Sequence, residues 1–121
     1  MAKTVLVVDD SATVRASVAF ILESAGYDVV QAVDGLDGVA KANAQKFDLI
    51  ITDVNMPNLD GIGLVRKVRE NAGNKFLPII VLTTEAQTAK MDEGKEAGAT
   101  GWIVKPFDQD KLLHVVKKVI A

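Results

Sequence analysis

The sequence predicts an α/β protein in which a parallel sheet is covered by helices on both faces. Short apolar runs rich in Val and Ile alternate along the chain with longer segments of helical period. These runs lack the polar and apolar alternation of a strand with one wet face, so they are typical of parallel strands buried on both sides. Strands and helices that alternate in this way form a layered α/β fold.

Five strands are expected from the apolar runs. The second run contains only two consecutive apolar residues, Val29 and Val30, so we expect it at an edge of the sheet. The third runs directly into Asp53, and turn-forming residues follow it. The strands are predicted over residues 5–8, 28–32, 49–52, 79–82 and 101–104.

Five helices are expected from apolar residues spaced three and four apart. They are predicted over residues 14–22, 35–46, 62–70, 86–97 and 111–120. The fourth helix offers only alanines and Met91 to a core, and its Gly94 costs about 1 kcal/mol relative to Ala. We therefore expect it to be the least firmly anchored. Asp108 or Asp110 is the expected cap of the last helix.

Length and composition indicate a single domain over residues 1–121, expected as a monomer in the cytoplasm. Sixteen acidic and fourteen basic residues give a net charge of -2, which argues against a nucleic-acid surface. The absence of cysteine excludes disulfides and thiolate metal sites. The apolar run at residues 5–8 is too short for a signal peptide or a membrane span.

Polar residues end four of the predicted strands. Two strand orders are common for such sheets, and in the order 2-1-3-4-5 the first and third strands are neighbours, with ligands bound outside the carboxyl ends. Chemically useful groups would then converge on one crevice from four separate strands. The residues at these strand ends are Asp9, Asp10, Asp53, Thr83 and Lys105.

Gathered carboxylates point to a metal ion and to phosphate chemistry. Each pair at contact distance repels by roughly 4 kcal/mol at an effective dielectric of about 20, so protons or a cation must intervene. Oxygen-only ligands favour Mg²⁺, which commonly binds one or two carboxylates together with a phosphate oxygen. Lys105 and Thr83 suit phosphoryl oxygens. Asp53 is the expected nucleophile, forming an aspartyl-phosphate.

The phosphoryl group must come from another molecule. The chain has no GxxxxGK[ST] motif, and Arg66 stands where a dinucleotide fingerprint beginning at Gly61 would need its third glycine.

With these residues in place, the whole chain resembles the receiver domains of two-component response regulators, most closely the single-domain chemotaxis type. The resemblance implies a three-layer flavodoxin-like (βα)5 fold with a five-stranded parallel sheet of order 2-1-3-4-5. It rests on the pair Asp9-Asp10, the run Asp53-x-x-Met56-Pro57-x-x-Asp60-Gly61, Thr83 at a strand end, and Lys105-Pro106-Phe107.

The resemblance also implies a site and a partner. A histidine kinase would phosphorylate Asp53, with Mg²⁺ held by Asp10, Asp53 and the backbone carbonyl of Asn55, and with Asp9 assisting through water. Thr83 and Lys105 would hold the phosphoryl oxygens. A cis peptide bond is implied between Lys105 and Pro106.

Two positions depart from the family pattern. Trp102 stands where the family usually has the Tyr or Phe that rotates on phosphorylation, so Thr83 and Trp102 are the candidate switch residues. Thr84 stands where many members have Ala or Gly, and its bulk is expected to slow the approach of water to the phosphoryl group.

The leading hypothesis is a phosphorelay signalling module, expected in chemotaxis, rather than an enzyme in the ordinary sense. Phosphorylation would switch a protein-binding surface made of the helix at 86–97, the strand at 101–104 and the helix at 111–120. The protein would remove its own phosphoryl group only slowly. We expect no nucleic-acid or membrane partner.

Two other functions and one structural interpretation stay open at this point. A Mg²⁺-dependent phosphatase would use the same aspartyl-phosphate, although Asn55 cannot act as the acid beside Asp53. A flavin carrier would need a neutral phosphate loop, which Asp9 and Asp10 oppose. Singly, Asp10 or Ser11 could serve only as a helix cap.

Overall fold

The computed structural model describes residues 2–84 and 89–120, and strands and helices alternate along this chain as the sequence predicts. The strands are β1 (Thr4–Val8), β2 (Asp28–Ala32), β3 (Leu49–Asp53), β4 (Ile79–Thr84) and β5 (Gly101–Lys105). The helices are α1 (Ala12–Ser24), α2 (Gly35–Ala44), α3 (Gly61–Glu70), α4 (Met91–Ala97) and α5 (Gln109–Ile120), with a short 3-10 helix, η1, at Ala72–Asn74.

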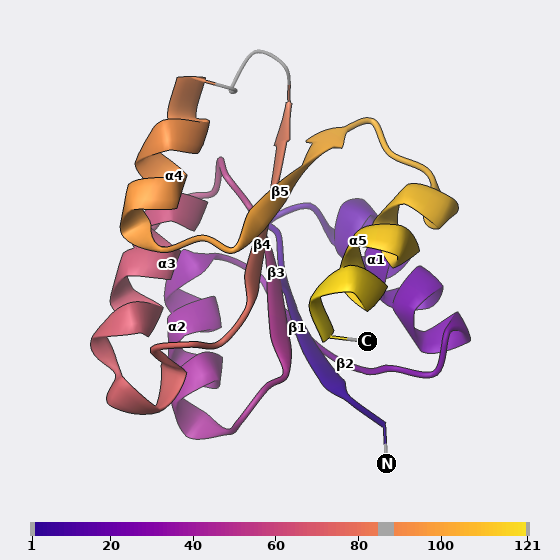
Figure 1. Ribbon diagram of the computed structural model, residues 1–121, viewed down its shortest axis with the longest axis horizontal. Helices are drawn as coiled ribbons and strands as arrows, with labels where there is room; N and C mark the ends of the chain where they lie inside the picture. The colour runs from indigo at the N-terminus through magenta and orange to yellow at the C-terminus, as the bar shows by residue number, and fades with distance from the viewer. Residues whose placement is uncertain (1, 85–88, 121) are drawn as a thin grey trace.

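The strands form one five-stranded parallel sheet in the order β2-β1-β3-β4-β5. Helices α2, α3 and α4 cover one face and α1 and α5 cover the other (Figure 1). The predicted fold class, the strand order and the edge position of β2 are therefore confirmed.

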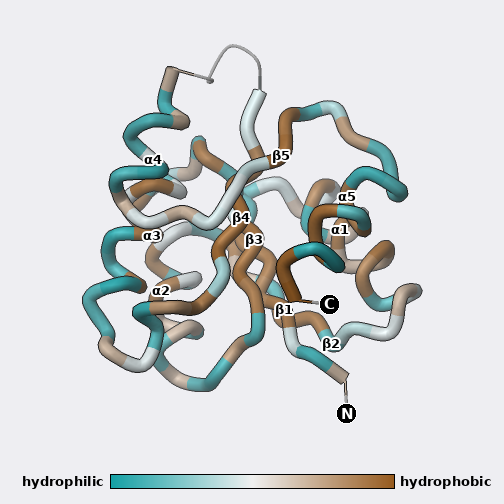
Figure 2. The backbone as a smooth tube through the Cα atoms, viewed as in Figure 1, coloured by the Kyte–Doolittle hydropathy of each residue, from teal (hydrophilic) through white to brown (hydrophobic). Residues whose placement is uncertain are grey.

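The sheet separates two apolar clusters because successive side chains of a strand point to opposite faces. In β1, Leu6 and Val8 pack toward α2 and α3, whereas Val5 and Val7 pack toward α1 and α5. Figure 2 shows the central strands as the most hydrophobic part of the chain, while the helices carry alternating polar and apolar positions. This double burial explains why the central strands β1, β3 and β4 are made mainly of apolar residues.

The register of the sheet brings the polar strand ends to one edge. Val8 of β1 lies opposite Thr52 of β3, so Asp9 and Asp53 each follow this pair at the carboxyl edge of the sheet. Thr84 of β4 lies opposite Lys105 of β5 at the same edge. Acids and an amine that are distant in sequence are thus delivered to neighbouring strand ends.

The starts of two helices can be compared with the sequence prediction. Helix α5 begins after Asp108, whose Oδ1 accepts a hydrogen bond from the Lys111 backbone N–H at 2.8 Å, so Asp108 rather than Asp110 is the cap. The helix predicted from residue 86 is described from Met91 onward as α4, and residues 85–88 lie outside the described residues. Within α4 only Gly94 is buried, which agrees with its expected weak anchoring.

Within the two described ranges, no helix has both the length and the apolar character needed to cross a membrane.

Candidate functional site

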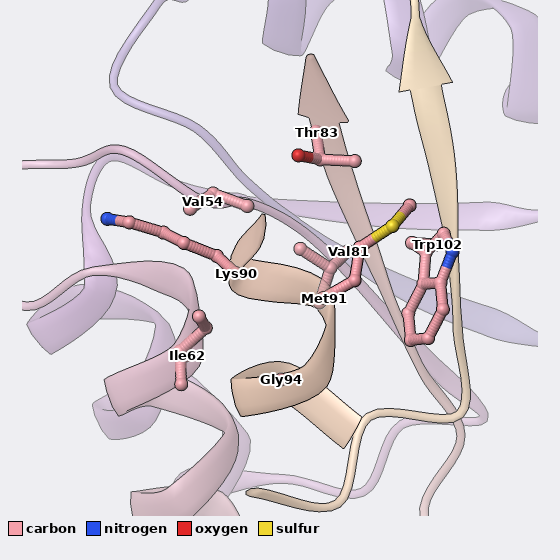
Figure 3. Close-up of a pocket in the computed structure, with 8 residues that line it drawn as sticks. All are labelled: Val54, Ile62, Val81, Thr83, Lys90, Met91, Gly94 and Trp102. Carbon is pink, nitrogen blue, oxygen red and sulfur yellow. The ribbon is translucent and has the colours of Figure 1, made fainter. Parts of the chain in front are cut away.

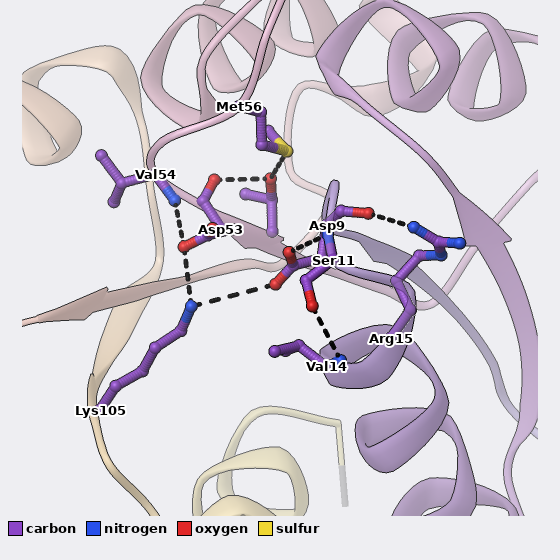
Figure 4. A network of polar contacts seen from close by, with 9 residues as sticks. Asp9, Ser11, Val14, Arg15, Asp53, Val54, Met56 and Lys105 are labelled. Atoms are coloured by element: carbon purple, nitrogen blue, oxygen red, sulfur yellow. Dashed lines mark hydrogen bonds and ion pairs between the residues drawn. The ribbon is translucent and has the colours of Figure 1, made fainter.

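Asp53 is the last residue of β3, and its carboxylate meets a cation. The Lys105 Nζ lies 3.0 Å from Oδ1 of Asp53 and donates a hydrogen bond to it. The backbone N–H of Val54 donates to the same oxygen at 2.9 Å (Figure 4). Asp53 is 9% exposed, so it combines a fixed orientation with limited access from solvent.

Asp9 follows β1 and is almost fully buried beside Asp53. Its Oδ1 accepts a hydrogen bond from the Ser11 backbone N–H at 2.9 Å. Its Oδ2 is 3.9 Å from Lys105 Nζ and has no hydrogen-bond partner among the described residues. Burial raises the pKa of the Asp9 carboxyl, the bond from Ser11 opposes this rise, and the negative charge of Asp53 adds to it.

The acidic cluster fits a divalent cation. Asp9, Asp10 and Asp53 each offer one carboxylate oxygen, and these oxygens lie within 4.8 Å of one another. A buried carboxylate oxygen without a partner, next to two further carboxylates, is unfavourable unless a positive charge compensates it. Because all the donors are oxygen atoms, the residues present fit Mg²⁺.

Thr83 lies at the carboxyl end of β4, and its hydroxyl bonds to the neighbouring backbone rather than to a described acid. It is 1% exposed, and its Oγ1 donates to the backbone carbonyl of Thr84 at 3.2 Å. Thr83 also lines a small pocket under α4 together with Trp102 (Figure 3). A contact between Thr83 and Asp53 is not present among the described residues.

Two further predicted residues remain to be placed. The side chain of Asn55 is exposed in the loop directly after β3, and the role of its backbone carbonyl as a metal ligand stays a prediction. Trp102 is half-buried in β5 and faces the pocket that Met91 and Gly94 of α4 also line. The structure thus brings Asp9, Asp10, Asp53 and Lys105 together in one site. It places Thr83 and Trp102 on a neighbouring pocket.

The peptide bond between Lys105 and Pro106 is cis, as the family resemblance implies.

The sequence interpretation gave no role to Arg15, which lies in the first turn of α1. Its Nη1 donates to the backbone carbonyl of Asp9 at 2.6 Å, and its Nε is buried without a partner among the described residues. A cation near the N-terminus of a helix opposes the helix dipole. That unfavourable position is the signal in the sequence that could have marked Arg15 as a residue with a local partner.

Comparison with known proteins gives one consistent result. Residues 5–117 match the family model described as the response regulator receiver domain. Protein PilH of Pseudomonas aeruginosa is 36% identical over 117 residues, which cover 97% of each chain. The chemotaxis response regulator CheY4 of Vibrio cholerae has a TM-score of 0.94 and 47% identity, with coverage of 98% of this chain and 99% of its own.

A third relative has a structure with a magnesium ion coordinated in its active site cleft. It is the receiver domain of the sensor histidine kinase PA1611 of Pseudomonas aeruginosa, with a TM-score of 0.91 and 29% identity. The match covers 99% of this chain and 98% of that domain. Since the family model spans nearly the whole chain and the fold agrees with it, the protein belongs to the response regulator receiver domain family and is of the CheY type.

Proposed function

We propose that the protein is a phosphoacceptor in which Asp53 takes a phosphoryl group from a histidine kinase in a Mg²⁺-dependent reaction. The observation that carries this proposal is the Lys105 ammonium 3.0 Å from Asp53, beside three carboxylates whose oxygens lie within 4.8 Å. Family membership supports it, because receiver domains act as phosphoacceptors rather than as ordinary enzymes.

The chemistry follows from the positions of these groups. An Asp53 carboxylate oxygen attacks the phosphorus of a phosphohistidine, a new P–O bond forms, and the P–N bond breaks. The leaving imidazole takes the bonding electron pair and a proton. Lys105 is positioned to neutralise charge on the phosphoryl oxygens, and such transfer depends mainly on positioning and charge neutralisation.

The residues that would hold the metal in this proposal are Asp10, Asp53 and the backbone carbonyl of Asn55, with Asp9 assisting through water. When bound, Mg²⁺ would neutralise charge on the carboxylates and on the incoming phosphoryl group. The magnesium ion in the active site cleft of the PA1611 receiver domain supports this assignment.

Thr83 and Trp102 form the proposed switch. The Thr83 hydroxyl now donates to the Thr84 carbonyl, and a rotation of its side chain would redirect it to a phosphoryl oxygen. Since Thr83 and Trp102 line one pocket with Met91, such a rotation would alter the packing beneath α4. The phosphoryl group would thereby bias the surface formed by α4, β5 and α5.

That surface is the proposed site for a protein target. A groove of about 580 Å³ on it is lined mainly by apolar groups of β5 and α5, among them Trp102, Val115 and Val119. The exposed Phe76 and the side chains of His114 and Lys118 border the same groove. We assign the pathway to chemotaxis on the strength of the likeness to CheY4.

The test is to add Mg²⁺ and a small phosphodonor, such as acetyl phosphate, and to follow intact mass together with the emission of Trp102. We expect one stable phosphoryl group per chain, absent without Mg²⁺ and absent in Asp53→Asn. Release of phosphate over many turnovers would instead indicate a phosphatase, and no uptake at all would contradict both functions.

A further inference from the structure

The loop at residues 54–60, between β3 and α3, contains a strained turn close to the acidic site. Asn58 has a φ of 70°, and it is the one residue other than glycine with a positive φ in the described ranges. The backbone N–H of Leu59 donates to the carbonyl of Pro57 at 2.7 Å, which closes a three-residue turn around Asn58. Turns of this kind with a positive central φ are rare and strained.

One carboxylate on α2 holds this turn. Asp34 is the N-cap of α2, and its Oδ1 accepts a hydrogen bond from the Asp37 backbone N–H at 2.8 Å. Its other oxygen, Oδ2, accepts a hydrogen bond from Asn58 Nδ2 at 2.7 Å. Both interactions lower the pKa of Asp34. The two oxygens of one side chain thus tie the start of a helix to the strained residue.

The loop backbone is also pressed against its neighbours at two glycines. A Cβ added at Gly35 would lie 2.0 Å from the Leu59 carbonyl oxygen, and one at Gly61 would lie 2.1 Å from the Asp53 carbonyl oxygen. The Gly61 N–H donates to the Val54 carbonyl at 2.8 Å, so the loop is closed at its base. A displacement at Asn58 would therefore be passed to the backbone next to Asp53.

We propose that Asp34 and Asn58 are positioning residues, whose hydrogen bond holds the 54–60 loop in the shape that presents Asp53 and Asn55 to the metal ion. This inference rests on the proposed function. Strained backbone persists only where its surroundings enforce it, and it concentrates at functional sites. Asn58 is exposed, so the bond adds little to folding, and a role in positioning accounts for it better than one in stability.

Two variants separate the hydrogen bond from other effects. Asn58→Gly accepts the positive φ without strain and removes the donor. Asp34→Ser keeps a capping oxygen for α2 but is too short to reach residue 58. The control is Asn43→Ala, which removes the bond from Asn71 Nδ2 to Asn43 Oδ1, at 3.0 Å. That bond also joins α2 to the end of α3, but at the opposite end of the molecule from the acids.

The measurement is Mg²⁺ affinity by titration calorimetry, together with the unfolding midpoint in the absence of Mg²⁺. We expect Asn58→Gly and Asp34→Ser each to weaken Mg²⁺ binding roughly tenfold, as loss of an outer contact to a metal site commonly does. The double variant should be no weaker than either single variant, because both remove the same bond. Asn43→Ala should bind Mg²⁺ like the wild type.

Unchanged Mg²⁺ affinity in the two single variants would overturn the inference, and so would additive losses in the double variant. A fall in the metal-free unfolding midpoint with unchanged affinity would show a merely structural bond and would also overturn it. Failure of the wild type to accept a phosphoryl group would refute the proposed function instead, since the affinity measurement does not depend on phosphoryl transfer.

Discussion

At the scale of single residues, the site is defined by charges that are only partly compensated. Asp9 is buried with one oxygen unpartnered, and Lys105 is 3.0 Å from Asp53 but 3.9 Å from Asp9. The single ammonium group of Lys105 therefore compensates the charge of two carboxylates only in part. Asp10, the third carboxylate of the cluster, is exposed to solvent. The excess negative charge favours the binding of a second cation, and it destabilises the folded protein when no such cation is bound.

Replacing Asp9 by Asn should stabilise the metal-free protein at neutral pH. Because burial raises the pKa of Asp9 above 3.8, the native state holds this proton more tightly than the unfolded chain does. Stability therefore falls as the pH rises from that value through the pKa of the folded state. We expect a gain of about 1 kcal/mol in the free energy of unfolding at pH 7, from removing a poorly satisfied buried group.

This gain in stability should disappear at a pH below the pKa of Asp9 in the unfolded chain, because the Asp9 carboxyl is then protonated in both the folded and the unfolded state. Urea unfolding in a chelator at neutral and acidic pH measures it. Asp10→Asn removes the same charge from an exposed position and should give no such gain, although both variants should weaken Mg²⁺ binding. Equal effects of the two variants on stability would be evidence against the role given to burial.

Replacing Lys105 by Met should have opposite effects on metal binding and on phosphoryl transfer. Mg²⁺ affinity should rise roughly tenfold, because a unit charge a few ångströms away no longer repels the ion. The rate of phosphoryl uptake should fall roughly a hundredfold, the usual loss for one group that stabilises developing charge. Calorimetry and time-resolved intact mass measure the two quantities, and Lys111→Met on α5 serves as the control. Parallel changes in both quantities would contradict the assignment.

At the scale of elements, periodicity in the sequence identifies the helices but not the side chains that join them. Arg69 follows Arg66 and Lys67 on α3, and unlike these two exposed residues it is only partly exposed. Its Nε and Nη2 donate to the Gly98 carbonyl at the end of α4, and its Nη1 donates to the Asn74 carbonyl at the end of η1. Long charged side chains bury their stems, so sequence pattern alone cannot show which of them bridge elements.

Replacing Arg69 by Met should loosen the end of α4. The change removes three hydrogen bonds and leaves two backbone carbonyls without them, so we expect a loss of about 1 to 3 kcal/mol in the free energy of unfolding. Arg69→Lys should not rescue this, because an ammonium group lacks the planar fork. Arg66→Met is the control, since Arg66 is exposed and 3.9 Å from Glu93. Equal losses in the free energy of unfolding for Arg69→Met and Arg66→Met, measured in urea, would refute this role.

At the scale of the whole molecule, the fold and the site were predictable for a common reason. Parallel strands buried on both faces are nearly continuous apolar runs, so the polar residues that end each run mark the carboxyl edge of the sheet. Asp9, Asp53 and Lys105 could be placed together from this rule. The direction of the Thr83 hydroxyl could not be predicted in this way, because a hydroxyl can rotate toward any nearby acceptor. Here it donates to the Thr84 carbonyl.

Mg²⁺ binding at the carboxyl edge of the sheet should raise the free energy of unfolding of the whole protein. A ligand that binds only the native state at a concentration of 100 times its Kd stabilises the protein by about 2.7 kcal/mol. We therefore expect Mg²⁺ to raise the urea midpoint of the wild type and to have much less effect on Asp10→Asn at the same concentration. An equal shift in both proteins would indicate that the ion binds elsewhere.

Residue mapping shows whether the phosphoryl group is attached to Asp53 and to no other carboxylate. After reaction with acetyl phosphate and Mg²⁺, borohydride reduces an aspartyl-phosphate to homoserine, which peptide mass spectrometry can place in the chain. We predict homoserine at position 53 alone. Homoserine at position 9, 10 or 60, or an unmodified Asp53 in phosphorylated protein, would contradict the account.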